Sequence, residues 1–325
     1  MPENNSRNGN QILVVMYHFV REVKSSRHPK IKGLELAQFK EQVKFLKKNY
    51  HICCMREVID ALENNTLLPC NSALLTFDDG YKDHFDFCFP ILDELNINGC
   101  FFPSAKPILE HKVLDLNKIH LILAAAENED SLLKDIFHSL DQYREEYILS
   151  SNEELWNRII KSMPPTELDN KNVTFVKRLL QRDLDESVRN RIIDDLLVKY
   201  IDMDEESLSK ELYMNIEQIK CMNWNGMHVG SHGYNHYYYS NISRDMQEDD
   251  IKKSMEFLKL VGTDLNNWTM CYPYGDFDKQ CISLLTQYNC KLAFRDNGGV
   301  GLLEDENRYS LERFDTRFLS KKENG

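Results

Sequence analysis

The chain has 325 residues, enough for one large domain or two smaller ones with substantial cores. Hydrophobic residues make up 42% and charged residues 28%, which is typical of a globular protein and excludes a largely disordered one. The formal net charge of −12 argues against a nucleic-acid partner and against a basic face for anionic membranes.

Short apolar runs of strand length recur along the chain, and several are continuous rather than alternating. This pattern is typical of parallel strands that are covered on both faces. The runs are residues 12–16, 73–77, 100–102, 227–229, 269–272 and 291–294. Amphipathic stretches at 36–48 and 246–260 predict helices between them, and this alternation indicates a parallel α/β architecture.

The middle of the chain differs, because residues 114–212 contain almost no strand pattern. Six helices are predicted there, at 119–126, 131–140, 153–162, 172–180, 186–200 and 205–212. We therefore predict an α/β domain formed by residues 11–113 and 213–320, interrupted by a helical insertion at 114–212. The ends, residues 1–10 and 321–325, are expected to be flexible.

The cysteine pattern and the first apolar run indicate the cellular compartment of the protein. Nine cysteines without a CxxC pair, two of them adjacent, argue against a disulfide framework and against a cysteine zinc site. The run at 12–16 is too short for a signal-peptide core or a membrane span. We predict a cytoplasmic protein without a transmembrane segment.

An electrostatic problem stands at Asp78 and Asp79, which end the apolar run at 73–77. Two adjacent carboxylates beside a buried strand repel each other, so they require a stabilising cation. His232 and His236 supply two imidazoles at spacing i, i+4. One Asp with two His is a three-ligand set that holds a catalytic zinc and leaves coordination positions open.

Two further polar segments, residues 16–18 and 271–275, also follow predicted strands. The carboxyl ends of the strands of a (β/α) barrel converge on one face, which is where the active site lies. Each signal alone is weak, since an Asp-Asp pair is often a turn and a single His-x-x-x-His is often incidental. Their common placement at strand ends favours one active site.

These motifs resemble those of the polysaccharide deacetylases, the family related to chitooligosaccharide deacetylase. The resemblance rests on T-F-D-D-G at 76–80, S-H-G-Y-N-H at 231–236, C-Y-P-Y-G at 271–275 and V-V-M-Y-H-F-V at 14–20. It covers roughly residues 11–105 and 220–320 and leaves the insertion out. It implies a distorted (β/α) barrel of about seven parallel strands with an all-helical insertion.

The resemblance also implies roles for individual residues. Asp78 is expected to be the general base, and Asp79, His232 and His236 the metal ligands. The segment Pro273, Tyr274 and Gly275 is expected to line the site and to offer a backbone N–H to the oxyanion.

The sequence departs from the family pattern at three places. Gly233 stands where Ser or Thr is usual, and Cys271 stands where many members have an Arg that steadies the base. Arg295 and Arg313 are both candidates to replace that charge. The late Leu-x-x-His that supplies a general acid is missing from residues 311–315. His18 is a candidate acid, and a structural, hydrogen-bonded histidine is an equally good interpretation.

Four tyrosines near the histidine pair admit two interpretations. Tyr234 and residues 237–239 either stack on a sugar ring or pack beneath the barrel rim.

Two functions from different classes remain open. The first is a hydrolase that removes an N-acetyl or N-formyl group from an amino sugar, with a nucleotide- or lipid-linked glycan precursor as the expected sugar substrate. Zn²⁺ is the expected metal, and Co²⁺, Ni²⁺ and Mn²⁺ are alternatives. The second is a catalytically silent sugar-binding or scaffold protein. The insertion is a candidate lid, homo-oligomer interface or docking surface.

Overall fold

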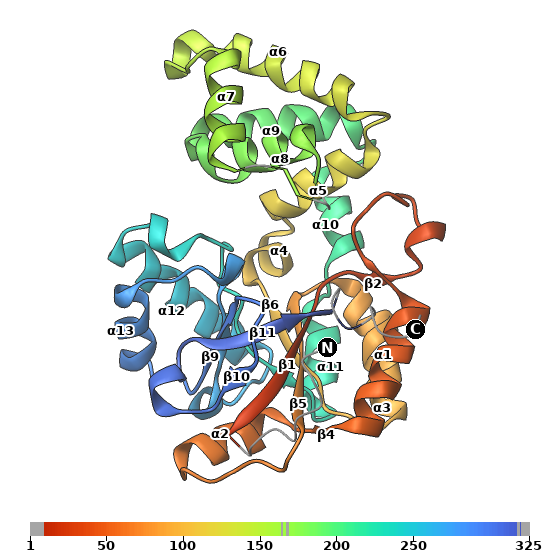
Figure 1. Cartoon of the computed structure of the whole chain (residues 1–325), viewed down its shortest axis with the longest axis vertical. Coiled ribbons are helices and arrows are strands. Elements are labelled where there is room, and N and C mark those ends of the chain that lie inside the picture. The colour runs from red at the N-terminus through yellow and green to blue at the C-terminus, as the bar shows by residue number, and fades with distance from the viewer. Residues whose placement is uncertain (1–9, 164, 167–168, 317–318, 320–325) are drawn as a thin grey trace. The chain divides into compact units, whose positions relative to one another are not determined.

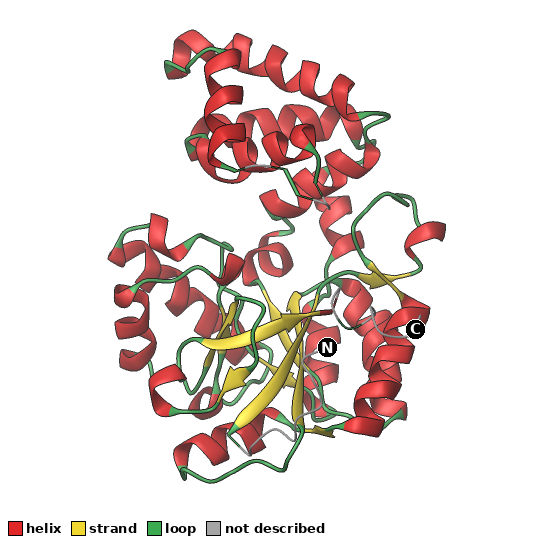
Figure 2. Ribbon diagram, viewed as in Figure 1, coloured by secondary structure: helices red, strands yellow, loops and turns green. Residues whose placement is uncertain are grey.

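A computed structural model of the chain describes residues 10–163, 165–166, 169–316 and 319 (Figures 1 and 2). The chain divides into two compact units, which we describe separately. The barrel unit comprises Met1–Glu22, Gly33–Lys112 and Ser209–Gly325, and the helical unit comprises Val23–Lys32 and Val113–Leu208. The predicted insertion, 114–212, did not include the first segment of the helical unit. The predicted flexible ends lie outside the described residues, except for Asn10.

Seven parallel strands form the distorted (β/α) barrel that the sequence predicted (Figure 1). They are β1 (Gln11–Tyr17), β5 (Ser72–Asp79), β6 (Cys100–Pro103), β7 (His228–Val229), β8 (Met270–Cys271), β9 (Ala293–Asp296) and β11 (Leu311–Asp315). Neighbours in the sheet are also neighbours in this series, and β1 pairs with both β5 and β11. A single bridge, Ser231 to Met270, joins the β7 and β8 segments. This short seam makes the barrel irregular.

Four two-residue strands complete the described sheets: β2 (Val20–Arg21), β3 (Leu34–Glu35), β4 (His51–Ile52) and β10 (Gly301–Leu302). β2 and β3 pair with each other, β4 extends the sheet beside the start of β5, and β10 runs antiparallel to β1.

Helices and short helical turns of the barrel unit surround its sheet (Figure 2). The α-helices are α1 (Leu36–Asn49), α2 (Met55–Glu63), α3 (Phe89–Glu94), α4 (Ala105–Glu110), α11 (Ile216–Trp224), α12 (Arg244–Leu260) and α13 (Lys279–Gln287). The short turns are η2 (His84–Cys88), η4 (Tyr239–Asn241), η5 (Leu265–Asn267), η6 (Pro273–Gly275) and η7 (Asp305–Asn307). The helices predicted at 36–48 and 246–260 are α1 and α12. Each buries one face, which is mainly apolar in α1 and includes Gln247, Asp250 and Ser254 in α12.

All six helices predicted in the middle of the chain are present. They are α5 (Asp115–Ala125), α6 (Glu129–Tyr147), α7 (Asn152–Ser162), α8 (Lys171–Arg178), α9 (Glu186–Tyr200) and α10 (Glu205–Leu212); η1 (Val23–Ser25) and η3 (Leu179–Asp183) add short turns. A reciprocal capping box between Ser151 and Glu154 opens α7. Lys30 donates to the carbonyl oxygens of Ala126 and Glu127, which explains why the segment before β3 belongs to the helical unit.

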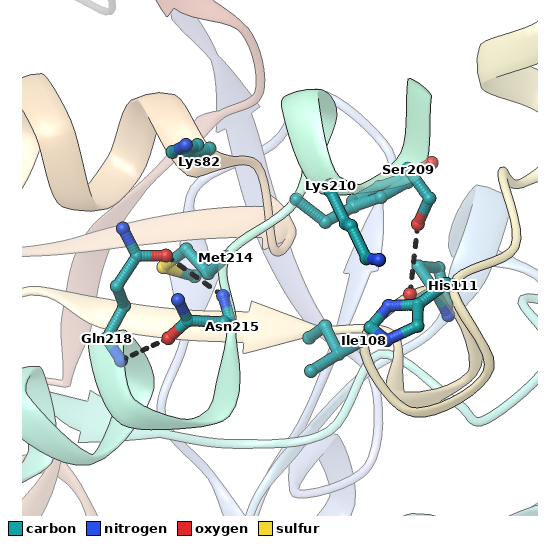
Figure 3. A pocket seen from close by; sticks show the side chains of 10 residues that line it. Lys82, Ile108, His111, Ser209, Lys210, Met214, Asn215 and Gln218 are labelled. Carbon is teal, nitrogen blue, oxygen red and sulfur yellow. Dashed lines mark hydrogen bonds between the residues drawn. The ribbon is translucent and has the colours of Figure 1, made fainter. Parts of the chain in front are cut away.

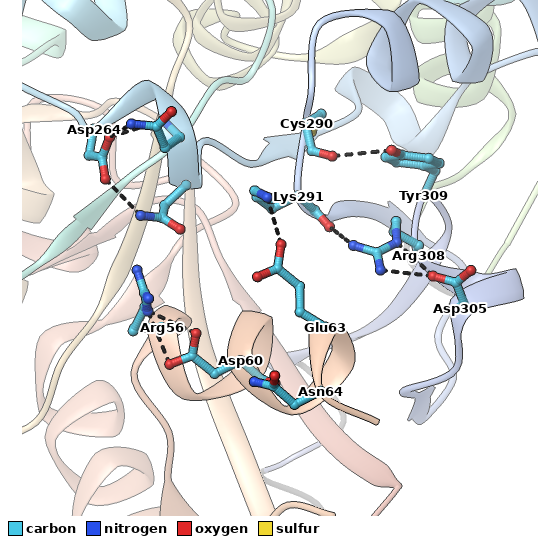
Figure 4. Close-up of polar contacts among 12 residues, drawn as sticks. Arg56, Asp60, Glu63, Asn64, Asp264, Cys290, Lys291, Asp305, Arg308 and Tyr309 are labelled. Carbon is cyan, nitrogen blue, oxygen red and sulfur yellow. Dashed lines mark hydrogen bonds and ion pairs between the residues drawn. The ribbon is translucent and has the colours of Figure 1, made fainter. Parts of the chain in front are cut away.

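α2 closes the end of the barrel where the parallel strands begin. Its apolar residues share one buried cluster with Ile12, Leu292 and Leu311, which lie at or near the starts of three strands. Figure 4 shows the polar contacts around this end, where Lys291 Nζ lies 2.6 Å from Glu63 Oε1. The carbonyl of Lys291 accepts a hydrogen bond from Arg308, so the segments before β9 and β11 are tied together (Figure 4).

All nine cysteines lie in the described residues, and none forms a disulfide. Six of them are buried, as expected for small apolar side chains. Among the described helices, none has both the length and the apolar character that crossing a membrane requires.

His84, in η2, is a buried histidine that makes stability depend on pH. Its Nε2–H donates to the carbonyl oxygen of His18 at 2.9 Å, and burial lowers the pKa of His84 to about 4. The unfolded chain takes up this proton near pH ~6.5. The free energy of unfolding should therefore fall as the pH drops from ~6.5 to ~4, by up to about 3 kcal/mol from this residue.

Urea unfolding of the His84→Gln variant at pH ~7 and ~5 measures this effect. The loss of stability on acidification should be smaller in the variant than in the unmodified protein. The His111→Asn variant changes an exposed histidine and serves as the control. An equal loss in all three proteins would contradict the assignment.

Candidate active site

β5 delivers Asp78 into the barrel because side chains alternate between the two faces of a strand. The preceding residue, Phe77, points outward: its ring stacks on Tyr17 at 5.0 Å and lies 6.0 Å from Phe39 of α1. Asp79 adopts φ +69° and Gly80 φ +79°, so the chain turns at the strand end. Both Asp side chains are 1% exposed, and each therefore needs a partner within the protein.

Asp79 lies between the two predicted histidines. Its Oδ1 is 3.4 Å from His232 Nε2 and 3.4 Å from His236 Nε2, and both imidazoles are buried. The Nδ1–H of His232 donates to the carbonyl of Cys271 at 2.8 Å. Because a carbonyl only accepts, this contact fixes the tautomer and leaves the Nε2 lone pair of His232 directed at Asp79.

The donor set fits a divalent metal. One ligand atom from each of the three side chains lies within 4.8 Å of the others. In the part of the chain that is described, neither carboxylate oxygen of Asp79 has a hydrogen-bond donor although both are buried. Two imidazole nitrogens and a carboxylate are ligands that Zn²⁺ and related ions accept. A cation would satisfy the buried oxygens that the protein leaves without donors.

The pKa values of the cluster also favour a positive charge at this point. Burial raises the pKa of Asp79, but the two imidazoles beside it hold that pKa well below its usual range. Burial lowers the pKa of His232, but Asp78 and Asp79 together raise it above its usual value. Burial lowers the pKa of His236 and favours the neutral imidazole that binds metals.

Asp78 is paired with a positively charged side chain, that of Arg313, rather than with histidines. Arg313 Nη1 donates to its Oδ1 at 2.8 Å, and Arg313 Nη2 lies 2.7 Å from its Oδ2. Burial alone would raise the pKa of Asp78, but Arg313 and then His232 lower it to about 2. Arg313 is itself 1% exposed, so the two charges form a buried pair. Of the two predicted arginines, Arg313 contacts Asp78, whereas Arg295 pairs with Glu312 at 2.6 Å.

His18 follows β1 and lies near the same carboxylate. Its Nε2 is 3.9 Å from Asp78 Oδ2, and its side chain is 43% exposed. The structure therefore brings this predicted residue to the site with one side open to solvent.

Asp250, which sequence reasoning missed, anchors the loop that carries both histidines (residues 232–236, the histidine loop). This fully buried carboxylate of α12 accepts from the backbone N–H groups of Tyr234 and Asn235 and from the hydroxyl of Tyr239, at 2.7–2.9 Å. Gly233 has φ +72°, and a Cβ there would lie 3.1 Å from Asp250 Oδ2. This close approach and the positive φ both favour glycine at position 233.

The predicted Pro273–Gly275 segment is the turn η6 beside His236. Tyr274 adopts φ +58°, its ring stacks on Tyr238 at 3.7 Å, and its centroid is 4.7 Å from that of His236. Within this turn, the N–H of Gly275 donates to the carbonyl of Tyr272, and Pro273 has no N–H. Tyr234 is tied to α4 by its hydroxyl, which donates to Glu110 at 2.6 Å.

Asp296, at the end of β9, is a second residue that the sequence did not single out. It is the register partner of Arg313, and its backbone would lie 2.7 Å from a Cβ on Gly275. Although the residue as a whole is exposed, desolvation raises the pKa of its carboxyl, while Arg313 and His18 oppose that rise. In the sequence, Asp296 stands two residues after the apolar run at 291–294, where it looks like part of a turn.

A cavity of about 330 Å³ lies in the barrel unit, and its lining includes no member of the Asp79–His232–His236 cluster (Figure 3). Its lining includes Lys82, Ile108, Lys210 and Met214. The backbone N–H of Met214 donates to the carbonyl of Gly80, directly after Asp79, so the cavity adjoins the end of β5. Two lysines stand around a mostly apolar wall, which suits an anionic group attached to an uncharged one.

A (β/α) barrel with an Asp–His–His cluster at the carboxyl ends of its strands offers a candidate site for a divalent metal. The sequence profile of the polysaccharide deacetylase family matches residues 203–293, which include the histidine loop and Pro273–Gly275. This match, together with the shared fold described next, supports the predicted resemblance to the polysaccharide deacetylases.

Solved structures of deacetylases share this fold. The Streptococcus pyogenes deacetylase PplD in complex with acetate is 17% identical with a TM-score of 0.54, covering 94% of this chain and 92% of that one. IcaB from Ammonifex degensii is 17% identical with a TM-score of 0.54, covering 94% and 91%. The BpsB deacetylase domain from Bordetella bronchiseptica is 13% identical with a TM-score of 0.54, covering 96% and 98%. No curated protein sequence matches significantly.

The Asp250→Asn variant tests the anchor of the histidine loop. An amide cannot accept from all the donors around Asp250, so the loop should lose its fixed geometry. Because partners behind metal ligands typically contribute 10–100-fold to affinity, we expect Zn²⁺ affinity to fall by about that factor. Competition with a chromophoric chelator measures it.

The neighbouring Asp249→Asn variant changes an exposed carboxylate of the same helix and should keep full affinity. Unchanged affinity in Asp250→Asn, with an unchanged circular dichroism spectrum, would show that the loop does not depend on Asp250.

Proposed function

We propose that this protein is a metal-dependent carbohydrate de-N-acetylase that hydrolyses the amide bond of an N-acylated amino sugar. One observation carries the proposal: two adjacent buried carboxylates have separate partners, Arg313 for Asp78 and the two histidines for Asp79. Both carboxylate oxygens of Asp79 are buried without a hydrogen-bond donor, beside two imidazoles. A protein without catalytic activity would have no reason to maintain this unfavourable arrangement.

Asp79, His232 and His236 would hold the metal, for which we propose Zn²⁺, with Co²⁺, Ni²⁺ and Mn²⁺ as alternatives. When bound, this ion would supply Lewis-acid activation of water and of the substrate carbonyl. A backbone N–H of the Pro273–Gly275 turn, which lies beside His236, is proposed to donate to the oxyanion that forms on the carbonyl.

Asp78 is proposed to accept the proton of the attacking water. Its Arg313 partner, which helps to lower its pKa to about 2, keeps it ionised at every pH at which the protein would work. Such a carboxylate is a weak base, so it can act only on a water whose own pKa has been lowered strongly. The proposed metal and Asp78 are therefore effective only together.

The leaving amine needs a proton, and the family's late histidine is absent. We propose His18 as the donor, because it is 3.9 Å from Asp78 Oδ2 and open to solvent on one side. Asp296 is the alternative, since it stands on the same face with a raised pKa. Water adds to the carbonyl carbon, the C–N bond breaks, and the products are a carboxylic acid and the free amino sugar.

The proposed substrate is an amino sugar, N-acetylated or N-formylated, that carries a phosphate group, as nucleotide- and lipid-linked glycan precursors do. Lys82 and Lys210 around the cavity beside β5 support a negatively charged substrate in a protein whose own net charge is −12. Nine cysteines without a disulfide support the proposed cytoplasmic location. The homo-oligomer interface on the helical unit stays a prediction, supported by Ile148 and Val198, which are 92% and 82% exposed.

Two variants test the reaction with a panel of N-acetyl sugars, with and without a phosphate group. Asp78→Asn should keep its metal but release acetate with a kcat lower by on the order of 10²–10⁴, the usual scale for a general base. His232→Ala should bind one metal equivalent fewer than the unmodified protein, because one of three ligands is lost.

Controls for this experiment are Asp86→Asn and His138→Asn, which change exposed residues. Acetate release that resists a chelator, or near-normal turnover in Asp78→Asn, would contradict the mechanism. An intact metal site without acetate or formate release from any sugar would favour the binding or scaffold function.

The proton donor is identified by the pH dependence of kcat/KM in His18→Gln and Asp296→Asn. If His18 is the acid, its variant should lose the basic limb of the profile, since activity no longer requires that proton. The Asp296→Asn variant should keep that limb. The reverse result would transfer the role to Asp296.

A further inference from the structure

A second cluster of metal-ligating side chains lies at the turn between β4 and α2. His51 belongs to β4, Cys53 follows it, and Glu57 lies in the first turn of α2. One ligand atom from each side chain lies within 4.8 Å of the others. All three come from seven consecutive residues, so the local backbone alone brings them together.

Backbone hydrogen bonds hold this turn in shape. The N–H of Cys53 donates to the carbonyl of Ala73 on β5, and the N–H of Cys54 donates to Glu57 Oε2 at 2.7 Å. The other oxygen of Glu57 is 3.0 Å from His51 Nε2. The two oxygens of Glu57 therefore have different partners: Oε2 accepts from the Cys54 N–H, and Oε1 faces the Nε2 of His51.

The cluster combines access with a buried donor. The side chains of His51 and Glu57 are 42% and 43% exposed, whereas Cys53 is fully buried beneath them. A cation from solvent would therefore first displace the exposed His51–Glu57 contact and then reach the buried sulfur of Cys53. An exposed ion pair of this kind contributes little to stability, so its loss on metal binding has a small effect.

We propose that His51, Cys53 and Glu57 form a second metal site, for a borderline-soft divalent ion such as Zn²⁺ or Co²⁺. Nitrogen, sulfur and oxygen donors together suit these ions and do not suit Mg²⁺ or Ca²⁺, which take oxygen ligands. Water completes the four-coordinate shell. The metal displaces the thiol proton of Cys53, which passes to solvent, so one proton is released for each ion bound.

This site is separate from the proposed catalytic metal. His51 pairs with Ser72, the first residue of β5, while Asp79 is the last. Seven residues of strand at ~3.3 Å each place the two sites roughly 23 Å apart, at opposite ends of the barrel. The second site holds the start of α2, the helix that closes the barrel, so its role is to stabilise the fold and does not rest on the proposed reaction.

Cobalt titration of the full-length protein tests the proposal. Thiolate bound to Co²⁺ gives a near-ultraviolet charge-transfer band, and the Asp79–His232–His236 cluster contains no sulfur. We expect the band to saturate at one thiolate-bound ion per chain and to disappear in Cys53→Ser. The matched control Cys54→Ser should keep it, because Ser also caps a helix.

His51→Asn and Glu57→Gln change partly exposed residues, so these variants can test the site if Cys53→Ser does not fold. Gln keeps the capping interaction with Cys54. Each should weaken the titration at least about tenfold, the scale of a lost metal partner. The absence of a band, a band that survives Cys53→Ser, or one that requires Cys54 would overturn the proposal.

Discussion

The charge of two adjacent buried carboxylates is the constraint on which the active site depends. Asp78 and Asp79 are each 1% exposed, and neighbouring negative charges in a protein interior repel strongly unless each has its own cation. Arg313 pairs with Asp78, and two imidazoles placed to hold the proposed metal ion flank Asp79. This unequal pairing makes the two residues chemically different, although they are identical side chains next to each other in sequence.

The backbone around Asp78 and Asp79 is strained at two positions and is held there by hydrogen bonds. Asp79 and His236 both have positive φ, a conformation that costs free energy in residues other than glycine. Asp250 offsets part of that cost by accepting hydrogen bonds from the backbone of Tyr234 and from the backbone and side chain of Asn235 in the histidine loop. At the opposite end of the barrel, the apolar residues of α2 pack into the buried cluster described above. The candidate active site and this packed cluster therefore lie at different ends of the same strands.

Much of the architecture could be predicted because it is encoded locally. Continuous apolar runs indicated buried parallel strands, and caps such as Ser151 with Glu154 indicated helix starts. Three features could not be predicted in this way. β11 alternates buried and half-buried residues and contains Arg313, so it lacks an apolar run. Asp250 looks like an ordinary acidic residue of an amphipathic helix, and Asp296 like part of a turn.

The sequence by itself determined the residue types, their order and their places at strand ends, because these follow from short-range patterns. Only the tertiary structure decided which arginine meets Asp78. Glu312 pairs in register with Arg295, and Arg313 with Asp296. Because side chains alternate along a strand, a shift of one residue would turn Arg313 out of the barrel. That register is fixed by pairing between strands far apart in sequence, which no local pattern contains.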